Sequence, residues 1–263
     1  MTLETQELSF AYGAEPVFAE LALAIPPGRI TALVGANGSG KTTILKNLAR
    51  ILRPSHGAVY LDGRSLAQLP TKAIARAMAV LPQNPEAPAG LLVRELVGYG
   101  RFAWQKPLTA MTAEDKAAVR EALILTGMTE LADRPVGTLS GGQRQRAWIA
   151  MALAQNSRIL LLDEPTTFLD MAHQFEVLSL LDRLNIEQGR TIVMVVHDLN
   201  QALRHAHHVI VLHAGKVIGS GAPDAVLTPQ TLAAAFGIRA DLIHDPRSGR
   251  RICVPYGLVA TGE

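Results

Sequence analysis

Eight residues near the N-terminus have the types and the spacing of a phosphate-binding loop. Residues 35–42 read Gly-Ala-Asn-Gly-Ser-Gly-Lys-Thr and match the pattern G-x-x-x-x-G-K-[ST]. Glycines let the backbone turn its N–H groups inward, and the N-terminus of a following helix adds partial positive charge at the same place. We therefore expect Lys41 to reach the β- and γ-phosphates of a nucleotide and the Thr42 hydroxyl to bind Mg²⁺.

The segments on both sides of this loop have the context that the motif requires. Residues 30–34 are β-branched and apolar, which predicts a buried strand. Residues 43–52 carry apolar side chains at helical spacing, and we expect Pro54 to end that helix. Nucleotide contacts are expected from Gly35, Asn37, Gly38, Ser39, Gly40, Lys41, Thr42 and Thr43.

Two adjacent carboxylates follow a second apolar run. Residues 158–162 are typical of a central strand in a parallel sheet, and Asp163 and Glu164 come directly after them. Open α/β sheets bind ligands at the carboxyl ends of their strands. We expect Asp163 to hold Mg²⁺ and Glu164 to act as a general base on the attacking water. The alternative, a solvated acidic turn, is disfavoured by the phosphate-binding loop in the same chain.

A histidine and a second helix start complete the candidate site. The strand expected at 192–196 ends in His197, which can donate a hydrogen bond to a γ-phosphate, although a single histidine more often has a structural role. Residues 139–143 read Leu-Ser-Gly-Gly-Gln and lead into an expected helix at 143–154. Ser140 and the two glycines thus begin a helix, which makes a second anion site.

In this order along the chain, the motifs resemble those of the nucleotide-binding subunits of ABC transporters, and the resemblance covers essentially all residues. It rests on Tyr12, the loop at 35–42, Gln83, the signature at 139–143, the acidic strand at 158–164, Leu169-Asp170 and His197. The resemblance implies that Tyr12 stacks on adenine with Val17 beside it. It also implies that Gln83 contacts Mg²⁺ or the attacking water and that His197 holds the γ-phosphate.

The same resemblance implies a head-to-tail homodimer in which each ATP contacts both chains. The signature residues Ser140, Gly141, Gly142 and Gln143 would contact the ATP held by the other subunit, and Asp170 would cross the interface. Residues 95–101, 165–174 and 236–250 resemble a subgroup that energises uptake of iron–siderophores, haem and vitamin B12. General ABC subunits usually have a small residue where Phe168 stands.

The implied fold class is α/β, with a RecA-like P-loop NTPase core, an antiparallel β subdomain and an inserted helical subdomain. Residues 1–83 and 157–222 would form the catalytic core, residues 84–156 the helical lobe, and residues 223–263 a C-terminal appendage without an assigned role. The residue pattern also predicts a hairpin at 61–64, a strand at 78–81, strands within 209–219, and helices at 113–127, 173–188, 199–205 and 229–236.

Composition limits the remaining possibilities. The chain has 263 residues and a net charge of +2, which is too small to indicate nucleic acid as a partner. The lone Cys253 rules out an internal disulfide and fits a reducing compartment. The sequence contains His205, His207, His208 and His213, for which we favour a structural role over metal binding.

No stretch approaches the ~20 apolar residues of a membrane span, and residues 1–5 do not resemble a signal peptide. A transport role would therefore need other chains to form the pore. The resemblance implies two separate transmembrane permease subunits and, indirectly, a periplasmic or lipoprotein substrate-binding protein. The subunit would lie peripherally on the cytoplasmic face of the inner membrane. The alternatives are a soluble ABC ATPase in translation or DNA repair, an ATP-binding regulator without turnover, and an exporter half.

Overall fold

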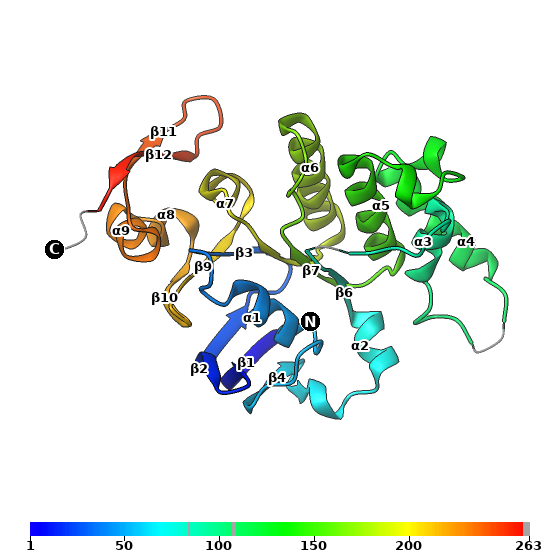
Figure 1. Cartoon of the computed structure of the whole chain (residues 1–263), viewed down its shortest axis with the longest axis horizontal. Helices are drawn as coiled ribbons and strands as arrows, with labels where there is room; N and C mark the ends of the chain where they lie inside the picture. The colour runs from blue at the N-terminus through cyan, green and yellow to red at the C-terminus, as the bar shows by residue number, and fades with distance from the viewer. Residues whose placement is uncertain (84, 107–108, 260–263) are drawn as a thin grey trace. The chain divides into compact units, whose positions relative to one another are not determined.

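The computed structural model describes residues 1–83, 85–106 and 109–259 (Figure 1). They form two compact units. The first unit comprises Met1–Ala67 and Val193–Glu263, and the second comprises Gln68–Ile192. Residues 84 and 107–108 of the expected helical lobe, and residues 260–263 of the expected C-terminal appendage, lie outside the described residues.

The first unit begins with an antiparallel sheet whose strands are ordered β2-β1-β4-β5. Its strands are β1 (Leu3–Tyr12), β2 (Glu15–Ile25), β4 (His56–Leu61) and β5 (Arg64–Ser65). Asp62 and Gly63 both have positive φ, 48° and 74°, as a two-residue hairpin turn requires. The hairpin predicted at 61–64 is thus confirmed.

A second set of strands in the first unit carries the phosphate-binding loop. All six residues of β3 (Ile30–Gly35) are buried, and β3 pairs in parallel with β9 (His208–His213). The antiparallel strand β10 (Lys216–Gly221) adds to β9. Strand β8 (Thr191–Val195) crosses from the second unit into the first, where the Val196 N–H donates to Leu33 O at 3.2 Å.

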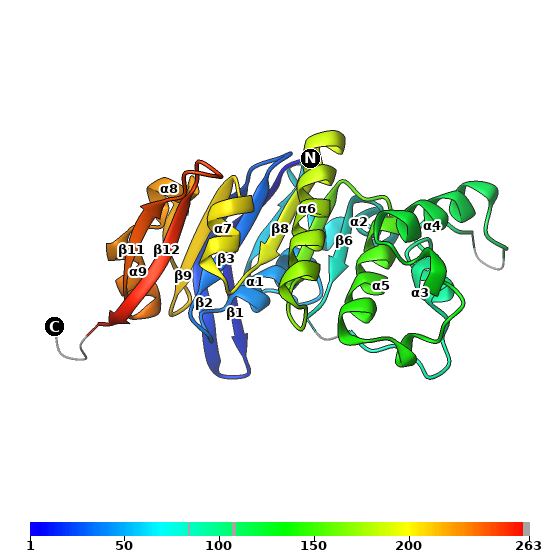
Figure 2. The same ribbon diagram turned by 90° about the horizontal axis from the view of Figure 1, so that it is seen from above.

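The first unit contains four helices among its described residues. They are α1 (Lys41–Leu48), α7 (Leu199–His205), α8 (Pro223–Val226) and α9 (Pro229–Phe236), so the helices predicted at 199–205 and 229–236 are confirmed. The chain then forms a hairpin of β11 (Ile238–His244) and β12 (Arg251–Leu258), drawn in orange and red in Figure 2. No sequence motif had predicted this hairpin.

The prediction that α1 runs to residue 52 was wrong. The helix ends at Leu48 because Arg50 takes a left-handed conformation, with φ of 55°. The Arg50 N–H then donates to Asn47 O and the Ile51 N–H to Lys46 O, both at 2.9 Å, which is the Schellman pattern of a helix end. A glycine usually marks this position, so an arginine gave no sequence signal.

The second unit combines parallel strands with a group of helices. Its strands β6 (Met78–Leu81) and β7 (Ile159–Asp163) pair in parallel. The first residue of β8 lies beside the residue that precedes β7: the Thr191 N–H donates to Arg158 O at 2.9 Å. The helices are α2 (Thr71–Ala77), α3 (Val93–Tyr99), α4 (Ala113–Leu125), α5 (Gly141–Ala154) and α6 (Met171–Gln188). Short 3₁₀ turns occupy Leu66–Gln68, at the boundary between the units, and Thr129–Leu131 and Val136–Thr138.

Helices α3, α4 and α5 pack on one another, as the green ribbons of Figure 1 show. Thr112 begins α4 as predicted: its hydroxyl accepts from the Asp115 N–H at 3.1 Å, and Asp115 accepts from the Thr112 N–H in return. The prediction of helical structure in this part of the chain is confirmed for the described residues.

Candidate functional site

The phosphate-binding loop joins β3 to α1 in the first unit. Gly35, Gly38 and Gly40 have positive φ of 153°, 77° and 97°. A Cβ atom on Gly35 would lie 2.2 Å from Leu212 O, so only glycine fits there. Gly40 is the N-cap of α1, and as a glycine it provides no capping side chain.

Lys41, the first residue of α1, is buried beside this loop. Its Nζ donates to Gly35 O and Ala36 O at 2.9 Å each. Ser39 Oγ is also buried and has no hydrogen-bond partner among the described residues. The space beyond Gly38 is open, since a Cβ atom there would meet nothing within 4 Å. A buried ammonium, an orphaned hydroxyl and an uncapped helix N-terminus fit a triphosphate.

The β1–β2 hairpin places Tyr12 and Val17 in the same unit as the loop. Val17 Cγ1 lies 3.2 Å from the position of a Cβ on Gly40, so Val17 lines the loop directly. Tyr12 is 52% exposed, and its ring lies edge-on to Phe10, with 4.9 Å between ring centroids. An exposed aromatic ring held by one neighbour can stack on a base.

His197 lies in the first unit, between β8 and α7. The preceding residue, Val196, is bonded to Leu33 on β3, the strand that leads into the loop. The following residue, Asp198, is the N-cap of α7 and accepts from the Asn200 N–H at 2.8 Å. His197 is thus exposed on a segment that is fixed on both sides.

Asp163 and Glu164 end β7 in the second unit. Asp163 is fully buried, and Glu164 has a left-handed backbone, with φ of 52°. Thr167 Oγ1 donates to Glu164 Oε2 at 3.0 Å, and the Thr167 N–H donates to Glu164 O at 3.2 Å. The tight turn after β7 therefore orients the Glu164 carboxylate.

The signature residues begin α5 in the second unit, as the sequence predicted. Ser140 is the N-cap: its Oγ accepts from the Gln143 N–H at 3.3 Å, and Gln143 Oε1 accepts from the Ser140 N–H at 3.1 Å. This capping box uses the Ser140 oxygen as an acceptor and leaves its proton to donate elsewhere. Because Ser140 and Gly141 are exposed, another molecule can reach this helix start.

Asp170 begins the next helix, α6. Its Oδ1 accepts from the His173 N–H at 2.9 Å, and its Oδ2 lies 2.8 Å from His173 Nδ1. The hydrogen bond from the His173 backbone, followed by that from its side chain, lowers the pKa of Asp170 below its ordinary value. Gly142 packs against this turn, since a Cβ on it would lie 3.3 Å from Leu169 Cδ2.

Three side chains that sequence reasoning missed hold the loop between Glu164 and α6. Gln145 on α5 donates to Pro165 O at 3.1 Å, and Gln174 on α6 donates to Leu169 O at 3.0 Å. His173 is the third, through Asp170. An aspartate before a helix is an N-cap signal, and it could have pointed to the third residue of that helix, His173, as its partner.

Gln83 follows β6 and lines a cavity of about 400 Å³ in the second unit. Gly141, Trp148 and Phe168 also line this cavity, so the structure brings Gln83 and the signature turn to one place. Phe168 has a φ of 65° and is 76% exposed.

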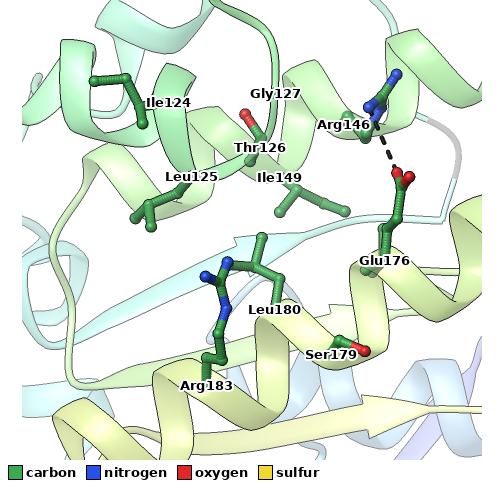
Figure 3. Close-up of a pocket in the computed structure, with 11 residues that line it drawn as sticks. Ile124, Leu125, Thr126, Gly127, Arg146, Ile149, Glu176, Ser179, Leu180 and Arg183 are labelled. Carbon is green, nitrogen blue, oxygen red and sulfur yellow. Dashed lines mark ion pairs between the residues drawn. The ribbon is translucent and has the colours of Figure 1, made fainter.

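A second cavity, of about 390 Å³, lies between α4, α5 and α6 and contains none of the site residues predicted from the sequence (Figure 3). Ile149 and Leu180 provide apolar walls, and Arg146 pairs with Glu176 at 3.6 Å.

The predicted residues thus fall into two groups. Tyr12, Val17, the loop and His197 belong to the first unit, whereas Gln83, the signature, Asp163, Glu164 and Asp170 belong to the second. Within the described part of the chain, no group of three or more His, Cys, Asp or Glu residues could hold a metal ion by itself. None of the described helices is long and apolar enough to cross a membrane.

Comparisons with known proteins agree with these motifs. A family model for ABC transporters matches residues 18–167. The chain is 53% identical, over 98% of its length and 96% of the relative, to the iron(3+)-hydroxamate import ATP-binding protein FhuC of Bacillus subtilis (strain 168).

Two solved structures have the same fold. One, of a metal-chelate type ABC transporter in an inward-facing conformation, is 31% identical with a TM-score of 0.84, covering 97% of both chains. The other is the dimeric structure of MJ0796, a bacterial ABC transporter cassette. It is 29% identical with a TM-score of 0.75, covering 84% of this chain and 98% of its own.

These similarities confirm the predicted fold class: a P-loop NTPase cassette with an antiparallel β subdomain and a helical part. The family model covers more than half of the chain, and the relative covers nearly all of it. The chain therefore belongs to the ABC transporter family, as an ATP-binding subunit that hydrolyses ATP.

Proposed function

We propose that this chain powers the import of Fe³⁺–siderophore complexes through a separate membrane permease. The near full-length similarity to an iron(3+)-hydroxamate import ATP-binding protein is the observation that supports this cargo class. A haem or a cobalamin-type compound is the alternative cargo within the same subgroup.

In the proposed mechanism, the residues of the first unit bind the nucleotide. Lys41 and the N–H groups of α1 hold the β- and γ-phosphates, and the remaining loop residues wrap around them. Tyr12 stacks on adenine, with Val17 beside it. His197 donates a hydrogen bond to the γ-phosphate, which stabilises the charge that develops there.

The second unit provides Glu164, which acts on water, and two of the three residues proposed to hold the metal. Thr42 of the first unit, with Gln83 and Asp163, would hold Mg²⁺. Bound Mg²⁺ neutralises charge on the β- and γ-phosphates. Glu164, oriented by Thr167, takes a proton from the attacking water as general base.

The signature residues act on the ATP of a second copy. The capped start of α5 offers N–H groups and the Ser140 proton to a γ-phosphate. In a head-to-tail homodimer, each site combines the loop of one chain with Ser140, Gly141, Gly142 and Gln143 of the other, and Asp170 crosses the interface. The MJ0796 cassette, whose solved structure is dimeric, supports a dimeric arrangement for this similar chain.

The homodimer would bind two transmembrane permease subunits on the cytoplasmic face of the inner membrane. A periplasmic or lipoprotein substrate-binding protein would deliver the cargo from the other side. Since ATP-driven closure brings the two cassettes together, the permease subunits attached to them can change conformation with each cycle.

Deleting the gene in its host cell and measuring uptake of ⁵⁵Fe tests this function. We expect ⁵⁵Fe-hydroxamate uptake to be lost and to return with the wild-type chain but not with Glu164→Gln. Normal hydroxamate uptake with loss of haem or cobalamin uptake would show that the cargo class is wrong. Normal uptake of all three would favour a soluble ATPase with another role.

A further inference from the structure

The C-terminal hairpin is joined to α7 by a pair of hydrogen bonds from one side chain. Asn200 Oδ1 accepts from the Cys253 N–H at 2.8 Å, and Asn200 Nδ2 donates to Cys253 O at 3.2 Å. An asparagine amide has the same donor and acceptor as a peptide group. Asn200 therefore pairs with the backbone of β12 as a residue of a neighbouring strand would.

The hairpin itself is well anchored. Cys253 and Ala240 are buried on its inner side, and β11 packs against α9. The Val259 N–H donates to Gly237 O at 2.9 Å and closes the base of the hairpin. Helix α7 also contacts β12. The hairpin can thus serve as a fixed support for α7.

Helix α7 has seven residues, which is too short to be stable by itself in water. Its C-terminal end is attached to β3: the His207 N–H donates to Ile30 O at 2.8 Å, and His207 Nδ1 accepts from the Ile30 N–H at 3.2 Å. The side-chain pair between Asn200 and Cys253 attaches its N-terminal end to the hairpin. The two ends of α7 therefore have different supports.

His197 lies next to the end that the hairpin holds. Asp198 follows it and accepts from the Asn200 N–H. On its other side, Val196 is bonded to β3. The place of His197 is thus set from β3 on one side and from the hairpin, through Asn200, on the other.

We propose that Asn200 is a positioning residue. It fixes the start of α7 to the β11–β12 hairpin and so places His197 for the γ-phosphate. This inference rests on the proposed role of His197. It gives the C-terminal appendage a function in turnover, although none of its residues is expected to touch ATP.

The test compares Asn200→Asp and Asn200→Ala with Cys253→Ala in the full chain. Asn200→Asp keeps the size of the side chain but places a carboxylate oxygen against Cys253 O, so one bond becomes a repulsion. Cys253→Ala is the matched control, because both bonds use the backbone of Cys253 and remain.

The first readout is hydrogen exchange of the nucleotide-free protein. In both Asn200 variants, we expect the Gln201 and Ala202 amides, which are bonded to Asp198, to exchange about tenfold faster. The His207 amide, bonded to Ile30, should keep its wild-type rate. Equal acceleration at both ends of α7 would indicate a general loss of structure and overturn the proposal, as would wild-type exchange throughout.

The second readout is ATP hydrolysis. We expect Asn200→Asp to lower kcat about tenfold with the KM for ATP within about twofold, since His197 acts on the γ-phosphate in the transition state. Cys253→Ala should behave like the wild type. Wild-type turnover in Asn200→Asp beside loss of turnover in His197→Ala overturns this inference alone. Wild-type turnover in His197→Ala overturns the proposed role of His197 and this inference with it.

Discussion

Glu164 follows β7 in a left-handed backbone conformation and accepts a hydrogen bond from Thr167. For a residue other than glycine, such a conformation costs about 1–2 kcal/mol. Glu164 remains in it because the turn to Thr167 and the packing of the following loop determine its backbone. Backbone strain of this kind is common at functional sites, where a side chain must be held in one orientation.

Glu164→Gln should bind ATP normally and lose turnover. The amide keeps the shape of the carboxylate but cannot accept a proton from water, so we expect kcat to fall on the order of 10²-fold or more. Steady-state hydrolysis, beside titration with a fluorescent ATP analogue, measures both effects. Wild-type turnover would show that another group is the base.

Tyr12→Ala should raise the KM for ATP with a smaller effect on kcat, because stacking on the base is already present in the ground state. Tyr12→Phe and Tyr12→Trp keep an aromatic ring and serve as matched controls with mild effects. If Tyr12→Phe weakens ATP binding as much as Tyr12→Ala does, the ring does not stack on adenine.

Among the elements, α3, α4 and α5 are joined by a buried ion pair. Arg101, just after α3, donates to Asp115 Oδ1 at 2.8 Å and to Ala154 O at 2.9 Å, and both side chains are 4% exposed. The Trp104 ring lies 5.1 Å from the guanidinium. A single residue thus connects the end of α3 to the start of α4 and the end of α5.

Asp115→Ala should destabilise the protein by about 3–5 kcal/mol, because it leaves the Arg101 charge buried without its partner. The double variant Arg101→Met with Asp115→Leu removes both charges, and we expect it to lose less stability than Asp115→Ala. Urea unfolding monitored by Trp fluorescence compares the variants. Equal losses of stability in both variants would mean that the unpaired charge of Arg101 is not what destabilises Asp115→Ala.

The same pair predicts a dependence on pH. Burial raises the pKa of Asp115, but hydrogen bonds from Arg101 and Thr112 outweigh that effect, so its pKa lies below the ordinary value of 3.8. A carboxyl with a lowered pKa stabilises the fold above its unfolded pKa, and this stabilisation is lost as the pH falls through the folded pKa.

We therefore expect the urea midpoint of the wild type to fall more steeply than that of Asp115→Asn below about pH 4. The variant lacks the titrating group, so the difference between the two curves isolates Asp115 from the other carboxylates. Parallel curves would show that Asp115 does not contribute in this range.

At the scale of the whole molecule, each chain has two helix starts that we propose bind phosphate, at α1 in the first unit and at α5 in the second. Only the first is preceded by a phosphate-binding loop. The second is exposed, and its capping box does not use the Ser140 hydroxyl proton, so a phosphate of another molecule could reach it. A dimer in which the α1 start of each chain faces the α5 start of the other chain would form two composite sites.

Ser140→Arg should block ATP-driven dimerisation while one subunit still binds ATP, because a bulky side chain holds the two faces apart. Size-exclusion chromatography with ATP, in the background of Glu164→Gln, measures the dimer. Loss of ATP binding by the Ser140→Arg monomer would place Ser140 at the nucleotide of its own chain and contradict the proposed dimer.

Mixing Ser140→Arg with Lys41→Ala gives a second test of the same arrangement. In a head-to-tail heterodimer, one site carries both changes and the other carries neither. Activity that appears only in the mixture would support the shared site.

Much of this protein could be predicted from local residue patterns. The loop at 35–42, the strand at 78–81, the helices at 199–205 and 229–236 and the capped starts at Thr112 and Ser140 depend on neighbours within a few residues. Such signals lie within one stretch of sequence, which is why the nucleotide-binding motifs could be found in the amino-acid sequence alone, and the family resemblance of these motifs then implied the fold class.

Only the tertiary structure decided which distant groups hold these motifs in place. Gln145 bonds to Pro165, 20 residues away, and Asn200 to Cys253, 53 residues away. In both pairs the partner is a backbone atom, which every residue type carries, so no side-chain pattern marks it. The end of α1 at Leu48, followed by the left-handed Arg50, and the β11–β12 hairpin were missed for a related reason. No residue type marks either of them in the sequence, because packing against the rest of the chain determines both.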